Sequence, residues 1–229
     1  MTGETGKRSD LGVRTRSGVI MMLVFSIAIW LGGWPFKFFV LILSVGLIRE
    51  WSMLVFAFVV SSMGRFMWLI IGFFYIGFAA WTLISLRDQY LAMALLPVAI
   101  VIATDVGAYF TGRAIGGPKI APRISPSKTW SGLIGGMLFA SIISAVSTEW
   151  VVLDDSYQLA LMGIFIGGGA MLAVCAQAGD FLESWMKRRA GVKDSGALIP
   201  GHGGLLDRMD GLLAVLFVFG AVTWMFRGL

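Results

Sequence analysis

The stretch "HGGLLDRMDGLLAVLFVFGAVTWMF" at residues 202–226 joins a group of ionisable side chains directly to an apolar run. Its first part holds the only histidine of the chain, His202, together with Asp207, Arg208 and Asp210, and residues 211–226 carry no charge. A helix needs about 20 mostly apolar residues to cross a bilayer. We therefore expect this stretch to begin at a membrane surface and to continue as a transmembrane helix, with two carboxylates at the start of that helix.

The composition of the whole chain agrees with this membrane interpretation. Hydrophobic residues form 58% of the 229 residues, charged residues form 14%, and the mean hydropathy is +0.85. A soluble domain is roughly half apolar and a quarter charged. We therefore expect a single integral membrane domain over residues 1–229, with no separate soluble domain. A lone cysteine, Cys175, excludes an intramolecular disulfide.

Seven apolar runs predict an all-α polytopic membrane bundle of about seven transmembrane helices. Arg49 and Glu50 interrupt the second run, so its helix either continues or stops at Ile48 and leaves 51–60 as an interfacial or broken segment. We expect the first run to stay in place as a helix behind a cytoplasmic tail at 1–17, because it lacks a cleavage pattern. The runs lie near 18–34, 36–60, 66–86, 91–112, 131–149, 157–180 and 210–227.

Basic residues lie almost entirely on one side of this predicted bundle. With the N-terminus in the cytoplasm, the tail and the segments around 49–65, 113–130 and 181–209 share one side and hold fifteen of the eighteen Lys and Arg residues. The opposite loop at 149–156 has three acidic residues and no basic one. The positive-inside rule therefore places loops 113–130 and 181–209 in the cytoplasm. They belong to the half of the chain at 105–229, which follows the predicted N-terminal helices at 18–104.

Both long inner loops are rich in glycine and basic residues, which suits an anionic ligand such as a lipid phosphate, a nucleotide or both. In "SPSKTWSGLIGG" at 125–136, Ser125, Ser127 and Lys128 precede a glycine-rich helix start. Hydroxyls, an ammonium group and free backbone N–H groups at such a position favour phosphate binding. The alternative is that the basic residues only fix topology and hold anionic lipid.

Carboxylates recur at the ends of the predicted spans. Asp105 lies late in the fourth run and Asp180 at the end of the sixth, where a carboxylate in hydrocarbon is costly unless it is paired or functional. Asp207 and Asp210 are three residues apart and share one face of a helix that begins there. Hard oxygen ligands without a histidine or cysteine cluster favour Mg²⁺.

Structural alternatives exist for each of these carboxylates. Asp105 could pair with Arg113, and an aspartate in the first turn of the last helix could serve as a helix cap. The glycines in "GLIGG" at 132–136 and "GIFIGGGAM" at 163–171 are typical of close helix packing rather than of ligand binding.

Two segments together resemble a known family. "SWMKRRAGVKDSGALIPGHGGLLDRMD" at 184–210 resembles, without a gap, the signature of the CDP-diacylglycerol synthases, also called phosphatidate cytidylyltransferases. "DVGAYFTGRAIGGPKIAPRISPSKTWSG" at 105–132 is similar to an earlier loop of that family. The resemblance thus covers the C-terminal half of the chain and implies that 105–229 is its catalytic half.

The resemblance implies a nucleotidyltransferase of phospholipid biosynthesis that transfers CMP from CTP to phosphatidic acid. It implies Mg²⁺ as cofactor, a bacterial cytoplasmic (inner) membrane location with the site facing the cytoplasm, and contacts with membrane lipids but not with nucleic acid; a homodimer is left open. The expected metal ligands are Asp180, Asp207 and Asp210, with Asp105 as a weaker candidate. The expected catalytic residues are Lys193, Asp207, Arg208 and Asp210. The expected substrate-binding residues are Ser125, Ser127, Lys128, Lys187, Arg188, Asp194 and His202.

Two rival functions remain at this point. The first is a CTP-dependent enzyme that acts on another membrane lipid, a polyprenol or an ether lipid. The second is a transporter that uses Asp105 and Asp180 along its path, although the charges gather on one side of the membrane instead of spreading through its depth. On the enzyme hypothesis, alanine at Asp207 abolishes turnover and leaves the protein folded.

Overall fold

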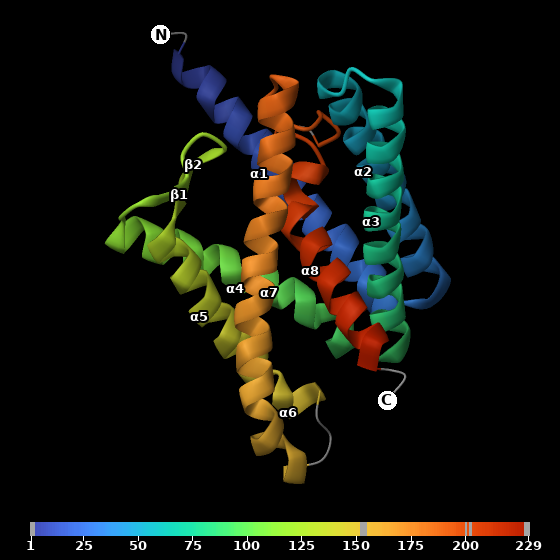
Figure 1. Cartoon of the computed structure of the whole chain (residues 1–229), viewed down its shortest axis with the longest axis vertical. Coiled ribbons are helices and arrows are strands. Elements are labelled where there is room, and N and C mark those ends of the chain that lie inside the picture. Colours follow the sequence, from blue (N-terminus) through green and yellow to red (C-terminus); the bar gives the residue numbers. More distant parts are fainter. Residues whose placement is uncertain (1–2, 152–154, 200, 202, 227–229) are drawn as a thin grey trace. The chain divides into compact units, whose positions relative to one another are not determined.

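The computed structural model describes residues 3–151, 155–199, 201 and 203–226 (Figure 1). The described part is helical apart from one short hairpin, which confirms the all-α prediction. His202 lies outside the described residues. The elements are α1 (Gly3–Leu31), α2 (Gly33–Phe58), α3 (Ser62–Gln89), α4 (Leu91–Ile115), β1 (Lys119–Ala121), β2 (Ser125–Thr129), α5 (Trp130–Val146), α6 (Thr148–Val151), α7 (Asp155–Ala190) and α8 (Leu206–Phe226).

The helices follow the apolar runs of the sequence. Five of them contain segments long and apolar enough to cross a membrane: α2, α3, α4, Leu161–Ala190 of α7 and Leu206–Met225 of α8. The apolar parts of α1 and α5 are shorter, at Thr15–Leu31 and Trp130–Val146. The predicted integral membrane helix bundle is confirmed. Helix α2 continues without a break past Arg49 and Glu50, so its second half is not a separate interfacial segment.

The chain forms two compact units. The first unit contains Met1–Gly77 and Met186–Met209, and the second contains Phe78–Trp185 and Asp210–Leu229. Helices α3, α7 and α8 each contribute residues to both units. The prediction of a single domain over the whole chain stays a prediction.

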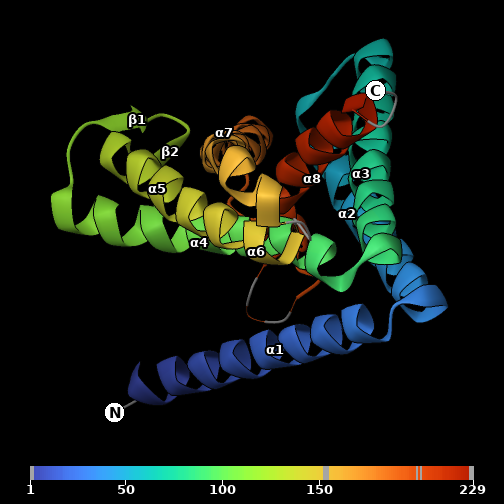
Figure 2. The ribbon, with the colours of Figure 1, turned by 90° about the horizontal axis from the view of Figure 1, so that it is seen from below.

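Glycines bring α4 and α5 close together in the second unit, where the two helices run side by side (Figure 2). A Cβ atom at Gly132 would lie 3.0 Å from the carbonyl oxygen of Ala108, and one at Gly136 would lie 3.0 Å from that of Thr104. Larger side chains at these positions would push the helices apart. The packing role predicted for the glycines at 132–136 is therefore confirmed.

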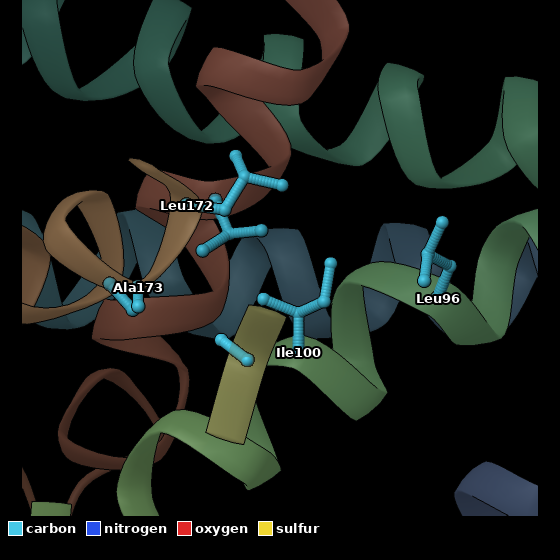
Figure 3. Packing of buried hydrophobic residues seen from close by; sticks show 7 residues of the cluster. Leu96, Ile100, Leu172 and Ala173 are labelled. Carbon is cyan, nitrogen blue, oxygen red and sulfur yellow. The ribbon is translucent and has the colours of Figure 1, made fainter. Parts of the chain in front are cut away.

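A buried apolar cluster lies within the second unit (Figure 3). Helices α4, α5, α7 and α8 all contribute to it, and three of its members are alanines with almost no exposed surface. Small side chains allow the backbones of these helices to approach closely. The cluster consists of Leu96, Ile100, Ala140, Leu172, Ala173, Ala176 and Val215.

The first unit is built around Trp51 of α2. Its Nε1 donates a hydrogen bond of 2.9 Å to the carbonyl oxygen of Trp68, and its ring lies 6.0 Å from those of Trp68 and Tyr75. A loop between α7 and α8 also belongs to this unit, and its Leu198 and Leu205 side chains lie against Gly46 of α2. The signature segment at 184–210 is thus packed, in part, against an early helix.

Candidate active site

A cavity of about 520 Å³ lies in the second unit among α4, β2, α5 and α7. Its lining combines two cationic side chains with one carboxylate, three hydroxyl groups and an amide. This mixture suits a charged ligand. The polar and charged lining residues are Asp105, Tyr109, Arg113, Ser127, Lys128, Thr129 and Gln177.

A short hairpin places the serine and lysine of the predicted phosphate loop in this lining. Strands β1 and β2 pair in antiparallel fashion, and Thr129 at the end of β2 caps α5 by accepting a 3.1 Å hydrogen bond from the Gly132 N–H. The cap fixes the point where the strand becomes a helix. As a result Ser127 and Lys128 reach the cavity, whereas Ser125 lies in the same strand outside its lining.

Lys128 connects the hairpin to α7. Its Nζ donates to Oδ2 of Asp180, and the two side chains keep 21% and 20% of their surface exposed. The ammonium group also lies 5.8 Å from the centre of the Phe181 ring. The alternative partner proposed for Asp105 is engaged elsewhere, because Arg113 donates a 2.8 Å hydrogen bond to the Tyr109 hydroxyl.

Three further carboxyl groups gather around Asp180. Asp105 of α4 interacts with both Asp180 and Lys128. Asp210 of α8 lies within hydrogen-bonding contact of Asp180 and also near Glu183, which is only 4% exposed. Two carboxyl groups in such close contact share a proton, which a bound cation could replace.

These residues meet the chemical requirements for Mg²⁺ without forming a complete metal site. Carboxylate oxygens are the ligands that Mg²⁺ prefers, and phosphate oxygens of a substrate commonly complete its shell. Among the residues that the structure describes, however, no three histidine, cysteine or acidic groups are arranged to hold a metal ion. One oxygen of Asp180 is occupied by Lys128. The metal assignment therefore stays a prediction.

Asp207 has very different surroundings in the first unit. Its Oδ1 accepts a 2.6 Å hydrogen bond from Lys187 Nζ, and the pair is largely buried, with 10% and 12% of the two side chains exposed. Its Oδ2 accepts from the N–H groups of Ser195 and Gly204, both at 2.9 Å, and from Ser195 Oγ at 3.1 Å. Asp207 thus holds the loop between α7 and α8 in shape.

Glu50 of α2, which the sequence analysis treated only as an interruption of a span, supports the same loop. It is fully buried, and its Oε2 accepts from the Leu206 N–H at 2.8 Å and from Ser195 Oγ at 3.1 Å. Its Oε1 has no hydrogen-bond partner within the described part of the chain. A Cβ atom at Gly204 would lie 2.7 Å from Oε2. The available signal was a carboxylate inside an apolar run, which marks a functional position by default.

The remaining predicted site residues also belong to the first unit. Lys193, Arg188 and Arg208 are exposed, and exposed Asp194 lines a cavity of about 430 Å³ together with Arg49 and Ser195. Gly203 has a φ of 80°, a left-handed conformation that favours glycine. The structure thus divides the candidates, with Asp105, Ser125, Ser127, Lys128, Asp180 and Asp210 in one unit and Lys187, Arg188, Lys193, Asp194, Asp207 and Arg208 in the other.

Comparisons with known proteins agree with the family suggested by the motifs. The model of the cytidylyltransferase family matches residues 52–226. The phosphatidate cytidylyltransferase of Brucella suis biovar 1 (strain 1330) is 44% identical over 161 residues, which cover 68% of this chain and 57% of that protein. The protein of the same name from Rickettsia bellii (strain RML369-C) is 34% identical over 213 residues, covering 90% and 88%. The chain thus spans little more than half the length of the Brucella relative.

Proposed function

The chain belongs to the cytidylyltransferase family, and from this premise we propose that it transfers CMP from CTP to phosphatidic acid. The products are CDP-diacylglycerol and pyrophosphate. The observation that carries the proposal is the Lys128–Asp180 pair, which joins a cavity lined by cations and hydroxyl groups to a group of crowded carboxylates. A basic surface for phosphates and an acidic surface for a cation are what two phosphorylated substrates require.

The proposed reaction exchanges one phosphoanhydride bond for another. A phosphate oxygen of the lipid attacks the α-phosphorus of CTP, and the bond from that phosphorus to the oxygen bridging to the β-phosphate breaks. Pyrophosphate leaves with the bonding electrons. The attacking phosphate is already ionised near neutral pH, so no strong general base is needed. The protein contributes positioning and neutralisation of charge.

Residues of the charged cavity supply the cationic part. Lys128 and Ser127 are proposed to bind phosphate oxygens, and Arg113, which the motifs did not single out, joins them because it lines the same cavity. The beginning of α5 adds the partial positive charge of a helix N-terminus. Lys187, Arg188, Lys193, Asp194, His202 and Arg208 are proposed as further substrate contacts.

Asp180 and Asp210 are proposed to hold Mg²⁺, with Asp105 as a weaker ligand. When bound, the ion would supply charge neutralisation for the departing pyrophosphate. Lys128, which pairs with Asp180, stands between this proposed metal site and the proposed phosphate contacts. Asp207 stays a proposed ligand, although its described contacts assign it to the loop.

The proposed setting is the cytoplasmic membrane of a bacterium, with the charged cavity at its cytoplasmic face. CTP then arrives from the cytosol and phosphatidic acid from the inner leaflet, so the acyl chains never cross water. This placement follows from the basic inner loops. A homodimer stays a prediction.

Release of pyrophosphate by the purified, detergent-solubilised protein tests the proposal. Phosphatidic acid with CTP and Mg²⁺ is expected to support release, whereas ATP or omission of Mg²⁺ is not. Asp180→Asn is expected to lose most of this release, and Asp88→Asn, which alters an acidic residue outside the proposed site, serves as its control for charge removal. Release that requires a polyprenyl phosphate or an ether lipid instead would favour the other CTP-dependent enzymes. A well-folded protein that releases none with any lipid would exclude the proposed activity.

A further inference from the structure

A second cavity in the second unit, of about 480 Å³, plays no part in the chemistry proposed above. Its volume falls within the range of roughly 300–1,000 Å³ that is typical of small-molecule sites. Five helices line it, mostly with aliphatic, aromatic and methionine side chains. The lining consists of Leu86, Gln89, Met93, Leu96, Ile100, Ser144, Ile164, Phe165, Gly168, Met171, Leu172, Phe219, Val222 and Thr223.

Two of the three polar side chains that line this apolar cavity are engaged within the protein. Gln89 Nε2 donates to the Ser85 carbonyl oxygen at 3.3 Å, and Thr223 Oγ1 donates to that of Gly220 at 3.1 Å. Burying a polar group without a partner is costly, but here that need is met locally. The cavity therefore suits a hydrocarbon ligand and not a second phosphate.

The apolar cavity and the charged cavity follow one another along two helices. On α4, Ile100 of the apolar lining precedes Asp105 of the charged lining by five residues, and on α7 Leu172 precedes Gln177 by the same number. At 1.5 Å per residue, each step corresponds to roughly 7.5 Å. Leu96, Ile100 and Leu172 also belong to the buried cluster shown in Figure 3.

We propose that the apolar cavity receives the distal part of one acyl chain of the lipid whose phosphate lies in the charged cavity. This inference rests on the proposed function. From Asp105 to Met93, at the far end of the α4 lining, the helix rises roughly 18 Å, well within a hydrocarbon core about 30 Å thick. A long chain reaches this depth, whereas a short chain ends before it. The apolar cavity thus makes the enzyme sensitive to chain length.

Gly168 gives direct experimental access to this cavity. It lines the cavity, and a Cβ atom built on it would meet nothing within 4 Å, so a larger side chain would enter open space. Gly167, its neighbour in α7, likewise has nothing within 4 Å but does not line the cavity. The glycines at 163–171 are therefore not a uniform packing surface. Only Gly169 of this segment would meet a backbone, at 2.7 Å from the Ala140 carbonyl oxygen.

The test compares Gly168→Leu with Gly167→Leu in the purified full-length protein, with dioleoyl and dioctanoyl phosphatidic acid as substrates. Gly168→Leu is expected to lower kcat/KM for the dioleoyl lipid about tenfold or more. The leucine side chain would occupy space that the acyl chain needs, and even one methylene group in a hydrophobic pocket changes kcat/KM by about tenfold or more. Its activity with the dioctanoyl lipid should stay within about twofold of the unmodified protein. Gly167→Leu should behave like the unmodified protein with both lipids. Met171→Trp, which fills the same cavity, replaces Gly168→Leu if that variant does not fold.

Equal losses with the two lipids, or no loss with either, would overturn the proposed acyl-chain site. If the unmodified protein releases no pyrophosphate at all, the proposed function fails instead. Mass spectrometry of the intact protein–lipid complex then decides about the cavity alone. Weaker retention of dioleoyl phosphatidic acid by Gly168→Leu than by Gly167→Leu supports the site, and equal retention rejects it.

Discussion

The acidic residues of the two units have different neighbours: hydrogen-bond donors in the first unit and other carboxyl groups in the second. In the first unit, Asp207 and Glu50 accept hydrogen bonds from a lysine, a hydroxyl group and backbone N–H groups. In the second unit, Asp105, Asp180 and Asp210 lie near one another, with Lys128 as the cation among them. Residues 207 and 210 are three apart in one helix, so proximity in the sequence does not assign them the same task.

These surroundings distinguish carboxylates that stabilise the fold from carboxyl groups that are candidates for ligand binding. A carboxylate that accepts several hydrogen bonds stabilises the fold, and its removal leaves donors unsatisfied. Carboxylates crowded together repel one another, and that cost is offset when a cation arrives. The second arrangement is therefore the better candidate for chemistry, and the first for holding a loop in place.

The largest effect is expected from Asp180→Asn in the second unit. Loss of the charge at the centre of the carboxylate group should lower turnover by about 10²–10³-fold, the range seen when a key electrostatic contact is removed. Because Asn keeps an acceptor oxygen for Lys128 while repulsion among the carboxyl groups is relieved, the thermal unfolding midpoint in detergent should stay the same or rise. Pyrophosphate release and a thermal melt measure the two effects. A lower midpoint with normal turnover would reverse the comparison.

Asp207→Ala in the first unit should instead destabilise the protein. Breaking a largely buried ion pair by removing one partner costs about 3–5 kcal/mol, and Lys187 together with the N–H groups of Ser195 and Gly204 loses an acceptor. Turnover should fall as well, because the signature loop is disturbed. The free energy of unfolding decides the matter: an unchanged stability with lost turnover would assign Asp207 to the metal and not to the loop.

Glu50 offers a finer test of the first unit. Glu50→Ala leaves the Leu206 N–H and Ser195 Oγ without their acceptor, which should cost about 1–3 kcal/mol. Glu50→Gln keeps one acceptor oxygen on a side chain of nearly the same shape. Its loss of stability should therefore be less than half of the loss in Glu50→Ala. The unfolding free energies of the two variants provide the comparison. Equal losses would show that the charge of Glu50, and not its hydrogen bonds, supports the loop.

The smallest effect is expected at Thr129, which lines the charged cavity but acts as a helix cap. Thr129→Ala removes the acceptor for the Gly132 N–H and should lower stability by about 1 kcal/mol. Thr129→Ser keeps the hydroxyl group and should match the unmodified protein. Turnover at saturating substrate should hardly change in either variant. A loss of turnover confined to Thr129→Ala would show that this hydroxyl group contacts substrate.

Much of the fold could be predicted from hydropathy alone, because a bilayer imposes a minimum length on each apolar segment. The helices match the predicted runs, and the glycines at 132–136 pack as expected for small residues. The division of the signature residues between two compact units could not be predicted. Spacing places Asp207 and Asp210 on one helix, but only tertiary structure shows which donors surround each of them.

Glu50 shows why the remaining contacts of the site could not be predicted from the sequence. Its partners lie 145 and 156 residues further along the chain, and no local pattern connects such distant positions. The motif residues suggested a site confined to the C-terminal half, yet the signature loop depends on an early helix. The match of the family model from residue 52 onward likewise extends the family relationship beyond those motifs.

The distance in sequence between Glu50 and its partners also sets an order of events during synthesis. Ribosomes add roughly 5–20 residues per second, so roughly eight to thirty seconds pass between the appearance of Glu50 and that of Leu206, its partner 156 residues later. During that time the nascent chain carries an acidic group in α2 whose full set of donors does not yet exist. The loop therefore cannot take its final shape before residue 206 has been synthesised.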